Sequence, residues 1–139
     1  MHNSQHLADP YSLTHLSHGL GFYALLRLVP IPEGWRFAAA VALEAGWEVL
    51  ENTPMVIDRY REATISLGYY GDTIANSGGD LLACVLGWVI AASVPARWSL
   101  ILFLATELLL LAAIRDNLTL NVIMLLWPID AIRRWQGGL

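Results

Sequence analysis

Two histidines and three glutamates in this sequence have the types and spacing of metal ligands. His15 and His18 lie three positions apart, and Glu44, Glu48 and Glu51 follow at intervals of four and three. Such intervals put side chains on one face of an α-helix. Imidazoles and carboxylates bind zinc, and carboxylates also suit magnesium or manganese. The pattern predicts a divalent-metal site, with a hydrogen-bonded structural pair of histidines as the alternative.

Further along the chain, a second polar row begins at Asp72 and continues at the same helical interval through Asn76 and Asp80. The predicted metal ligands are taken from both regions: His15, His18, Glu48 and Asp72. The predicted catalytic residues, which would serve as acids and bases or position the substrate, are Glu48, Glu51, Asp72 and Asn76. Carboxylates on one face repel one another unless they are protonated, paired with arginine or bound to a cation. The alternative is that both rows hold helices together.

Arginines near these rows suggest recognition of an anion. Guanidinium groups bind phosphates through paired, charge-assisted hydrogen bonds. The predicted anion-binding residues are Arg59, Arg61, Arg115 and Asn117. Together with the acidic rows, they would allow a metal-activated water to attack a phosphate that the arginines hold.

The composition indicates a membrane protein and not an ordinary soluble domain. Of the 139 residues, 56% are hydrophobic and 14% are charged, and the mean hydropathy is +0.50. Soluble domains are nearer one quarter charged. All eight basic residues are arginines, and the formal net charge is −4, which argues against a nucleic-acid partner. Cys84 is the single cysteine, so a disulfide framework and a cysteine-based zinc site are excluded.

The expected fold is an all-α transmembrane bundle of four to five spans in one integral membrane domain, residues 1–139. A membrane span needs about 20 mostly apolar residues. The expected spans are residues 11–29, 35–51, 73–94, 98–114 and 118–130, the last being short or interfacial. The turn at Val94–Arg97 predicts that the third and fourth spans form an antiparallel hairpin, and Gly78, Gly79 and Gly87 would let helices approach closely.

The arginines also predict orientation, because short cytoplasmic loops are enriched in basic residues. With five spans, five arginines lie on the cytoplasmic side and the first residue lies outside: Arg27, Arg36, Arg97, Arg133 and Arg134. With four spans and an interfacial C-terminal helix, the excess of arginine moves to the opposite face. The start of the chain lacks the pattern of a signal peptide, so the first span is expected to direct insertion. We expect a multi-pass protein of a bacterial inner membrane, with its C-terminus in the cytoplasm.

Short blocks of sequence carry a resemblance to a known family. They include Trp47-Glu-Val-Leu-Glu-Asn-Thr-Pro54 and Arg115-Asp-Asn-Leu-Thr-Leu-Asn121, and the full set is residues 3–9, 12–19, 47–54, 57–61, 63–66, 69–73, 76–77 and 115–121. They resemble a proteobacterial family of inner-membrane proteins with a domain of unknown function, over nearly the whole chain. That resemblance implies an inner-membrane location and no particular reaction.

A second resemblance is local. The run of Asp72, Asn76, Gly79 and Gly87 is similar to one helix of VanZ-like membrane proteins. It extends over about one span and likewise implies no reaction.

Three functions fit these observations. The first is a metal-dependent hydrolase or transferase that acts on a lipid or lipid-linked substrate. The second is a non-catalytic accessory subunit of a larger membrane complex, with a membrane-protein partner or a second copy of the chain. The third is a small proton-linked or ion-linked binding or transport module. The expected cofactor is a divalent metal, zinc or magnesium/manganese, and membrane lipids are the expected surroundings.

Overall fold

The computed structural model describes residues 4–138 as an all-helical protein. Within these residues there are helices and connecting segments and no strand. The helices are α1 (Ser12–Leu26), α2 (Glu33–Glu51), α3 (Pro54–Ala63), α4 (Ile74–Ser93), α5 (Ala96–Ile114), α6 (Leu118–Leu126) and α7 (Asp130–Gln136). The expected all-α class is confirmed.

The helix ends follow local sequence signals. Thr73 precedes α4, and its hydroxyl accepts a hydrogen bond from the Asn76 amide. Asn117 precedes α6, and its Oδ1 accepts from the amide of Leu120 at 2.8 Å. Such side chains satisfy amides that have no partner inside the helix. Pro54 opens α3, where a missing amide hydrogen costs nothing.

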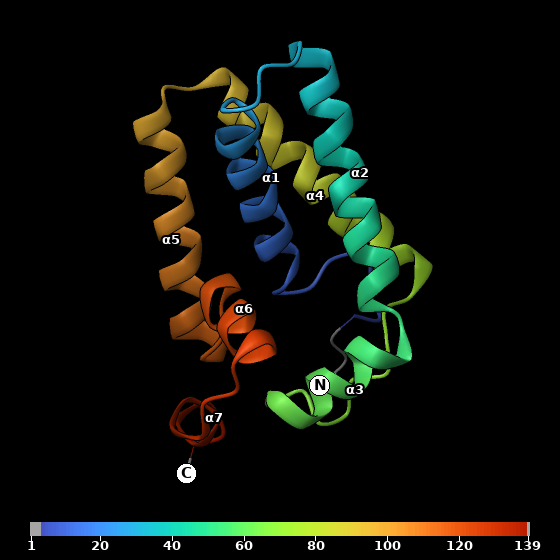
Figure 1. Cartoon of the computed structure of the whole chain (residues 1–139). Helices are drawn as coiled ribbons and strands as arrows, with labels where there is room; N and C mark the ends of the chain where they lie inside the picture. The colour runs from blue at the N-terminus through green and yellow to red at the C-terminus, as the bar shows by residue number, and fades with distance from the viewer. Residues whose placement is uncertain (1–3, 139) are drawn as a thin grey trace.

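The central feature of the fold is the contact between α1 and α4, flanked by α2 on one side and α5 on the other (Figure 1). A Cβ atom on Gly19 would collide with the backbone of Cys84 and Trp88, and one on Gly87 would collide with the carbonyl of Leu16. The two backbones therefore approach closely only because these positions lack a side chain. Gly87 has its expected packing role, whereas Gly78 faces open space.

The structure confirms the expected hairpin and modifies the expected spans. Only Val94 and Pro95 separate α4 from α5, which return antiparallel to each other (Figure 1). In the described part of the chain, α4 and α5 are the two helices long and apolar enough to cross a membrane, with mean hydropathies of 1.5 and 1.9. The first expected span contains a helix of 15 residues, and α2 carries five charged residues. Four to five spans therefore stay a prediction.

The segment expected as a fifth span, residues 118–130, is not one helix. α6 ends after nine residues, just before Trp127 and Pro128. The Arg133 guanidinium in α7 then donates to the Glu62 carbonyl in α3 at 3.0 Å, and Gln136 donates to Asp116 at 3.1 Å. The C-terminal helix therefore lies at the same end of the molecule as α3 and the start of α6. The interfacial alternative for this segment stays a prediction.

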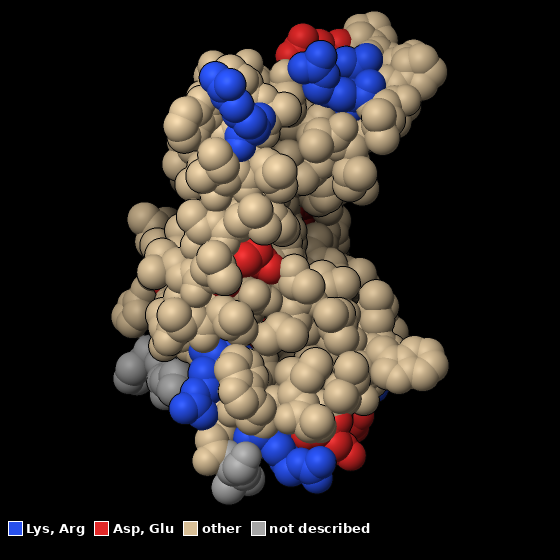
Figure 2. Space-filling model, turned by 90° about the vertical axis from the view of Figure 1, so that its left-hand side faces the viewer, with Lys and Arg blue, Asp and Glu red and all other residues tan. Residues whose placement is uncertain are grey.

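Apolar side chains cover much of the outer surface. Figure 2, which faces α5, shows blue and red atoms gathered toward the two ends of the molecule, with a broad tan belt between them broken by small red patches. Large exposed apolar side chains of α5 lie along this helix: Trp98, Leu100, Ile101, Leu104, Leu108 and Leu109. An exposed apolar surface of this extent is typical of contact with lipid or with another protein.

Candidate metal centre

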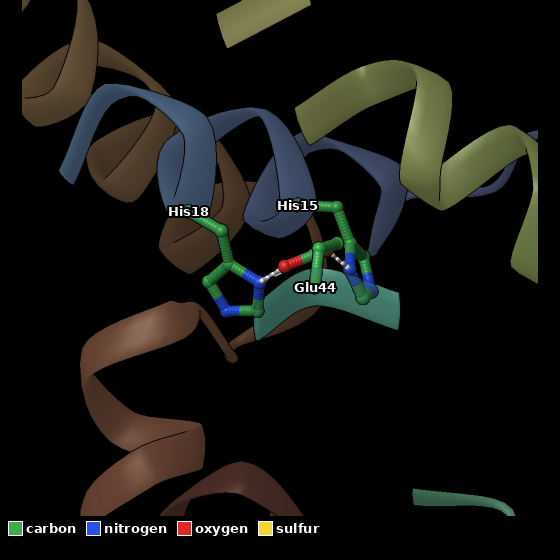
Figure 3. A group of neighbouring side chains, drawn as sticks. All are labelled: His15, His18 and Glu44. Carbon is green, nitrogen blue, oxygen red and sulfur yellow. Dashed lines mark hydrogen bonds and ion pairs between the residues drawn. The ribbon is translucent and has the colours of Figure 1, made fainter. Parts of the chain in front are cut away.

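The closest polar cluster joins two histidines of α1 to one glutamate of α2 (Figure 3). His15 Nδ1 lies 2.5 Å from Glu44 Oε1, and His18 Nδ1 lies 2.9 Å from Glu44 Oε2. The Glu44 side chain is fully buried, and that of His18 is 17% exposed. One carboxylate thus faces two imidazole nitrogens, an arrangement that suits either two N–H···O hydrogen bonds or a shared cation.

Two more buried carboxylates lie close to the His15 ring. Glu48 Oε1 is 3.4 Å from its Nδ1, and Asp80 Oδ2 is 3.8 Å from its Nε2. Asp80 also accepts a hydrogen bond from the Ser12 hydroxyl at 2.7 Å. Within residues 4–138, two groups of side chains could hold a metal ion: His15 with His18 and Glu44, and His15 with Glu48 and Asp80.

Glu48 is only 7% exposed. Neither of its carboxylate oxygens nevertheless has a hydrogen-bond partner in the protein. A buried ionised carboxylate without a partner is strongly disfavoured. A cation or a water molecule at His15 would supply the missing partner.

The fold explains why these residues meet. The close approach of α1 and α4 at Gly19 and Gly87 brings the His15 ring beside Asp80. One helical turn separates Glu44 from Glu48, so both carboxylates of α2 reach the same ring. The site is therefore built by side chains of three helices, α1, α2 and α4.

A large cavity opens beside the cluster. It has a volume of about 1190 Å³ and is lined by His15, His18 and Asp80 among other residues. Apolar side chains from three helices form part of its wall: Phe22, Leu43, Trp47, Leu118, Val122 and Leu125. Polar side chains, including Glu51, Tyr60, Tyr69, Asp72 and Asn121, line another part. A space of this size and mixed lining suits an amphiphilic ligand.

Asp72 and Asn76 have local partners that the sequence pattern does not reveal. Asp72 Oδ2 accepts hydrogen bonds from the Tyr69 hydroxyl at 2.8 Å and from Asn52 at 3.1 Å. The pKa of Tyr69 lies far above its usual value because of burial and the nearby charges of Glu51 and Asp72, so its hydroxyl remains a donor. Asn76 donates to the His6 carbonyl at 2.9 Å. Asp72 lines the cavity but belongs to neither metal group.

The predicted anion-binding residues do not form one cluster, and the three arginines among them donate to backbone carbonyls. Arg59 donates through Nε to the Leu125 carbonyl at 2.8 Å, and Arg61 donates through Nε to the Tyr69 carbonyl at 2.5 Å. Arg115 lines the cavity and donates to the Trp135 carbonyl at 3.2 Å. Asn117 caps α6. These contacts fasten connecting segments and helix ends, and anion binding by these four residues stays a prediction.

Two members of the metal groups, Glu44 and Asp80, are missing from the set predicted from sequence. Glu44 belongs to the same helical row as Glu48, and Asp80 continues the row of Asp72 and Asn76. Their spacing marks the correct helix faces. Which member of each row reaches His15 depends on how α2 and α4 cross α1, and spacing does not contain that information.

Comparison with known proteins identifies similar sequences. The family model described as "Protein of unknown function (DUF2585)" matches residues 1–138. A UPF0314 protein of Paracoccus denitrificans is 50% identical over 139 residues, which are 99% of this chain and 72% of that protein. One of Rhizobium meliloti is 49% identical over 138 residues, 98% of this chain and 70% of the relative.

A more divergent relative is the UPF0314 protein of Novosphingobium aromaticivorans, which is 46% identical over 143 residues, 98% of this chain and 72% of its own. No solved structure matches the chain. The printed names of these relatives specify neither an activity nor a cofactor.

Proposed function

The chain belongs to the DUF2585 family of proteins of unknown function, and from its site we propose that it is a metal-dependent hydrolase or transferase of a bacterial inner membrane. Its substrate would be a lipid or a lipid-linked molecule. The observation that carries the proposal is the buried Glu48 carboxylate, which lies 3.4 Å from the His15 imidazole and has no hydrogen-bond partner in the protein.

The proposed metal ligands are His15, His18 and Glu44. Two imidazoles and one carboxylate form the donor set of catalytic zinc sites that keep a position free for water. A zinc ion held there would supply a water with a lowered pKa and would polarise the bond under attack. Glu48 would serve as the base for that water, because its oxygens lie beside His15 and have no hydrogen-bond partner in the protein.

Asp80 would act through His15 as a positioning residue. Its Oδ2 faces Nε2, the ring nitrogen opposite the one that faces Glu44. A ligating histidine commonly donates its second N–H to a carboxylate, which fixes the orientation of the ring. The hydrogen bond from Ser12 holds Asp80 in place for this role.

The proposed setting is a membrane with α1, α2, α4 and α5 as spans. The apolar α4 and α5 and the exposed apolar side chains support it. In this arrangement α7 lies beside α3, so Arg133 and Arg134 join Arg59, Arg61 and Arg115 at one end. Because basic residues favour the cytoplasmic side, we place the C-terminus in the cytoplasm. The start of α1 would share that side, unlike in the five-span prediction.

Chromogenic amphiphiles test this function without knowledge of the natural substrate. We would measure release of p-nitrophenol from p-nitrophenyl laurate and from p-nitrophenyl dodecyl phosphate by zinc-loaded protein in lipid nanodiscs. Chelation should abolish release, and Glu48→Gln should retain zinc but reduce release about a hundredfold. The exposed Glu62 provides the control variant, Glu62→Gln, which should act like wild type. Zinc-loaded protein without chelator-sensitive release from either probe would contradict the proposal.

A second candidate is the accessory subunit of a membrane complex. The arginines favour it, because the Nε groups of Arg59 and Arg61 both donate to backbone carbonyls of the protein itself. These two groups therefore hold the fold together and are not available to a substrate. In that case the buried polar network fixes the fold, and a partner would cover part of the apolar surface. Mild detergent extraction followed by cross-linking would then recover one partner in fixed proportion, with no metal bound.

A further inference from the structure

The cavity beside the metal centre is lined by both apolar and polar side chains. Phe22 from α1, Leu43 and Trp47 from α2, and Val122 and Leu125 from α6 form apolar lining. The segment between α3 and α4 contributes Tyr69 and Asp72, and the end of α2 contributes Glu51. A ligand that fills this space would place a hydrocarbon chain against the first set and a polar head group against the second.

The charges around the cavity disfavour an anionic head group. Four carboxylic acids contribute to the lining, namely Asp9, Glu51, Asp72 and Asp80. Among residues 4–138, Arg115 is the one arginine that lines this cavity, and it already donates to the Trp135 carbonyl. The histidines His15 and His18 also line the cavity, but both already face Glu44, so a phosphate beside Glu51 and Asp72 would meet mainly acids.

Glu51 shows that the polar part of the cavity lacks a hydrogen-bond donor for one buried oxygen. Its Oε2 atom is buried and has no hydrogen-bond partner in the protein, although the residue lines the cavity. The neighbouring acid differs, because Asp72 already accepts from Tyr69 and Asn52. A buried acceptor without a donor is costly, and a ligand that donates a hydrogen bond removes this cost.

We propose that the amphiphile bound here carries a non-anionic head group that donates a hydrogen bond to Glu51, through a hydroxyl or an ammonium group. This inference rests on the proposed function for the identity of the reacting site and specifies its substrate class. The chain of the ligand lies along the wall formed by Phe22, Leu43 and Val122, and the head group lies beside Glu51 and Asp72.

Three probes with the same alkyl chain test the inference: dodecyl glucoside, dodecylamine and dodecyl phosphate. Binding to the full chain in phosphatidylcholine nanodiscs would be measured by titration calorimetry after chelation, so that bound metal does not attract the phosphate. Empty nanodiscs provide the baseline. The glucoside or the amine should bind about tenfold more tightly than the phosphate. The stronger of the two identifies a hydroxyl or an ammonium donor.

The variant Glu51→Gln should weaken binding of the preferred probe about tenfold and leave phosphate binding unchanged or improved. The control Glu62→Gln, at an exposed position of α3, should match wild type. Equal or tighter binding of the phosphate by wild type would overturn the inference even if Glu51→Gln fails to fold. In a folded Glu51→Gln protein, unchanged binding of all three probes would also overturn it.

A zinc titration of the same preparation separates this inference from the proposed function. Head-group selectivity without stoichiometric zinc would retain the Glu51 subsite and reject the metal-dependent reaction. Stoichiometric zinc with preference for the phosphate would retain the metal site and reject the subsite.

Discussion

His15 Nδ1 lies 2.5 Å from Glu44 Oε1, across the interface between α1 and α2, and both residues are buried. Because His18 Nδ1 approaches the other oxygen of the same carboxylate, Glu44 connects two imidazoles of one helix. A single buried group thus determines the rotation of both rings. Nearby Glu48 has no hydrogen-bond partner in the protein, which distinguishes the cluster from a fully hydrogen-bonded structural network.

If Asp80 orients His15, then Asp80→Asn should weaken zinc binding about tenfold while the protein stays folded, because the amide orients the Nε2–H less well. Zinc affinity would be measured by competition with a chelating dye, and circular dichroism would verify folding. Asp130→Asn, at an exposed position of α7, is the control and should bind zinc as wild type does. A folded Asp80→Asn protein with unchanged affinity would remove the positioning role.

The α1–α4 contact predicts opposite effects for two glycine substitutions. Gly87→Ala should destabilise the protein by about 1–3 kcal/mol, since the new methyl group collides with the Leu16 carbonyl and forces the helices apart. Gly46→Ala in α2 has open space around it and should stabilise by about 0.5–1 kcal/mol through helix propensity. Unfolding in a denaturing detergent titration measures both. Equal effects of the two substitutions would mean that the α1–α4 distance is not limiting.

Glu107 predicts a coupling between α5 and α6. Its two carboxylate oxygens accept hydrogen bonds from the amides of Leu118 and Thr119, each at 3.0 Å, in the first turn of α6. In Glu107→Gln one oxygen becomes an NH₂ donor that faces an amide, so the variant should lose about 1–3 kcal/mol of stability. Hydrogen exchange should accelerate in α6 more than in α4. Equal hydrogen-exchange rates in α6 of wild type and Glu107→Gln would show that the hydrogen bonds from Glu107 do not stabilise this helix.

The contact between Arg133 and the Glu62 carbonyl predicts the membrane topology. In a Cys84→Ser background, the single-cysteine variants Glu62→Cys and Arg134→Cys should react with a membrane-impermeant maleimide from the same side. Arg97→Cys, in the first turn of α5, should react from the other side. If Arg134→Cys is labelled together with Arg97→Cys, residues 118–130 cross the membrane and the four-span proposal is wrong.

Much of the fold can be predicted from apolar windows and helix caps. Val94 and Pro95 allow only a tight turn, so the hairpin of α4 and α5 follows from the sequence. The division of residues 118–130 is harder to predict, because hydropathy stays high through Trp127 while Pro128 interrupts the helix. Local patterns thus predict where helices form better than which of them cross a membrane.

The candidate site is predicted in part for a related reason. Helical spacing places His15, His18 and Glu48 on faces that the structure brings together. Helical spacing does not distinguish Glu44 from Glu51, which lie on the same face of α2. Which of the two lies beside His15 depends on the point along α2 at which this helix packs against α1. Nor does helical spacing reveal that the Arg59 guanidinium binds a backbone carbonyl, since every backbone position offers that acceptor.

The most direct test of the central claim is elemental analysis of protein purified in detergent without chelators. Wild type should contain about one zinc or another divalent transition-metal ion per chain, as expected for a set of two imidazoles and one carboxylate. The folded variants His15→Ala/Glu48→Ala and Glu44→Gln should contain little, and Glu62→Gln should retain it. Metal-free wild type that also fails to take up added zinc would contradict the claim and leave the buried network a structural role.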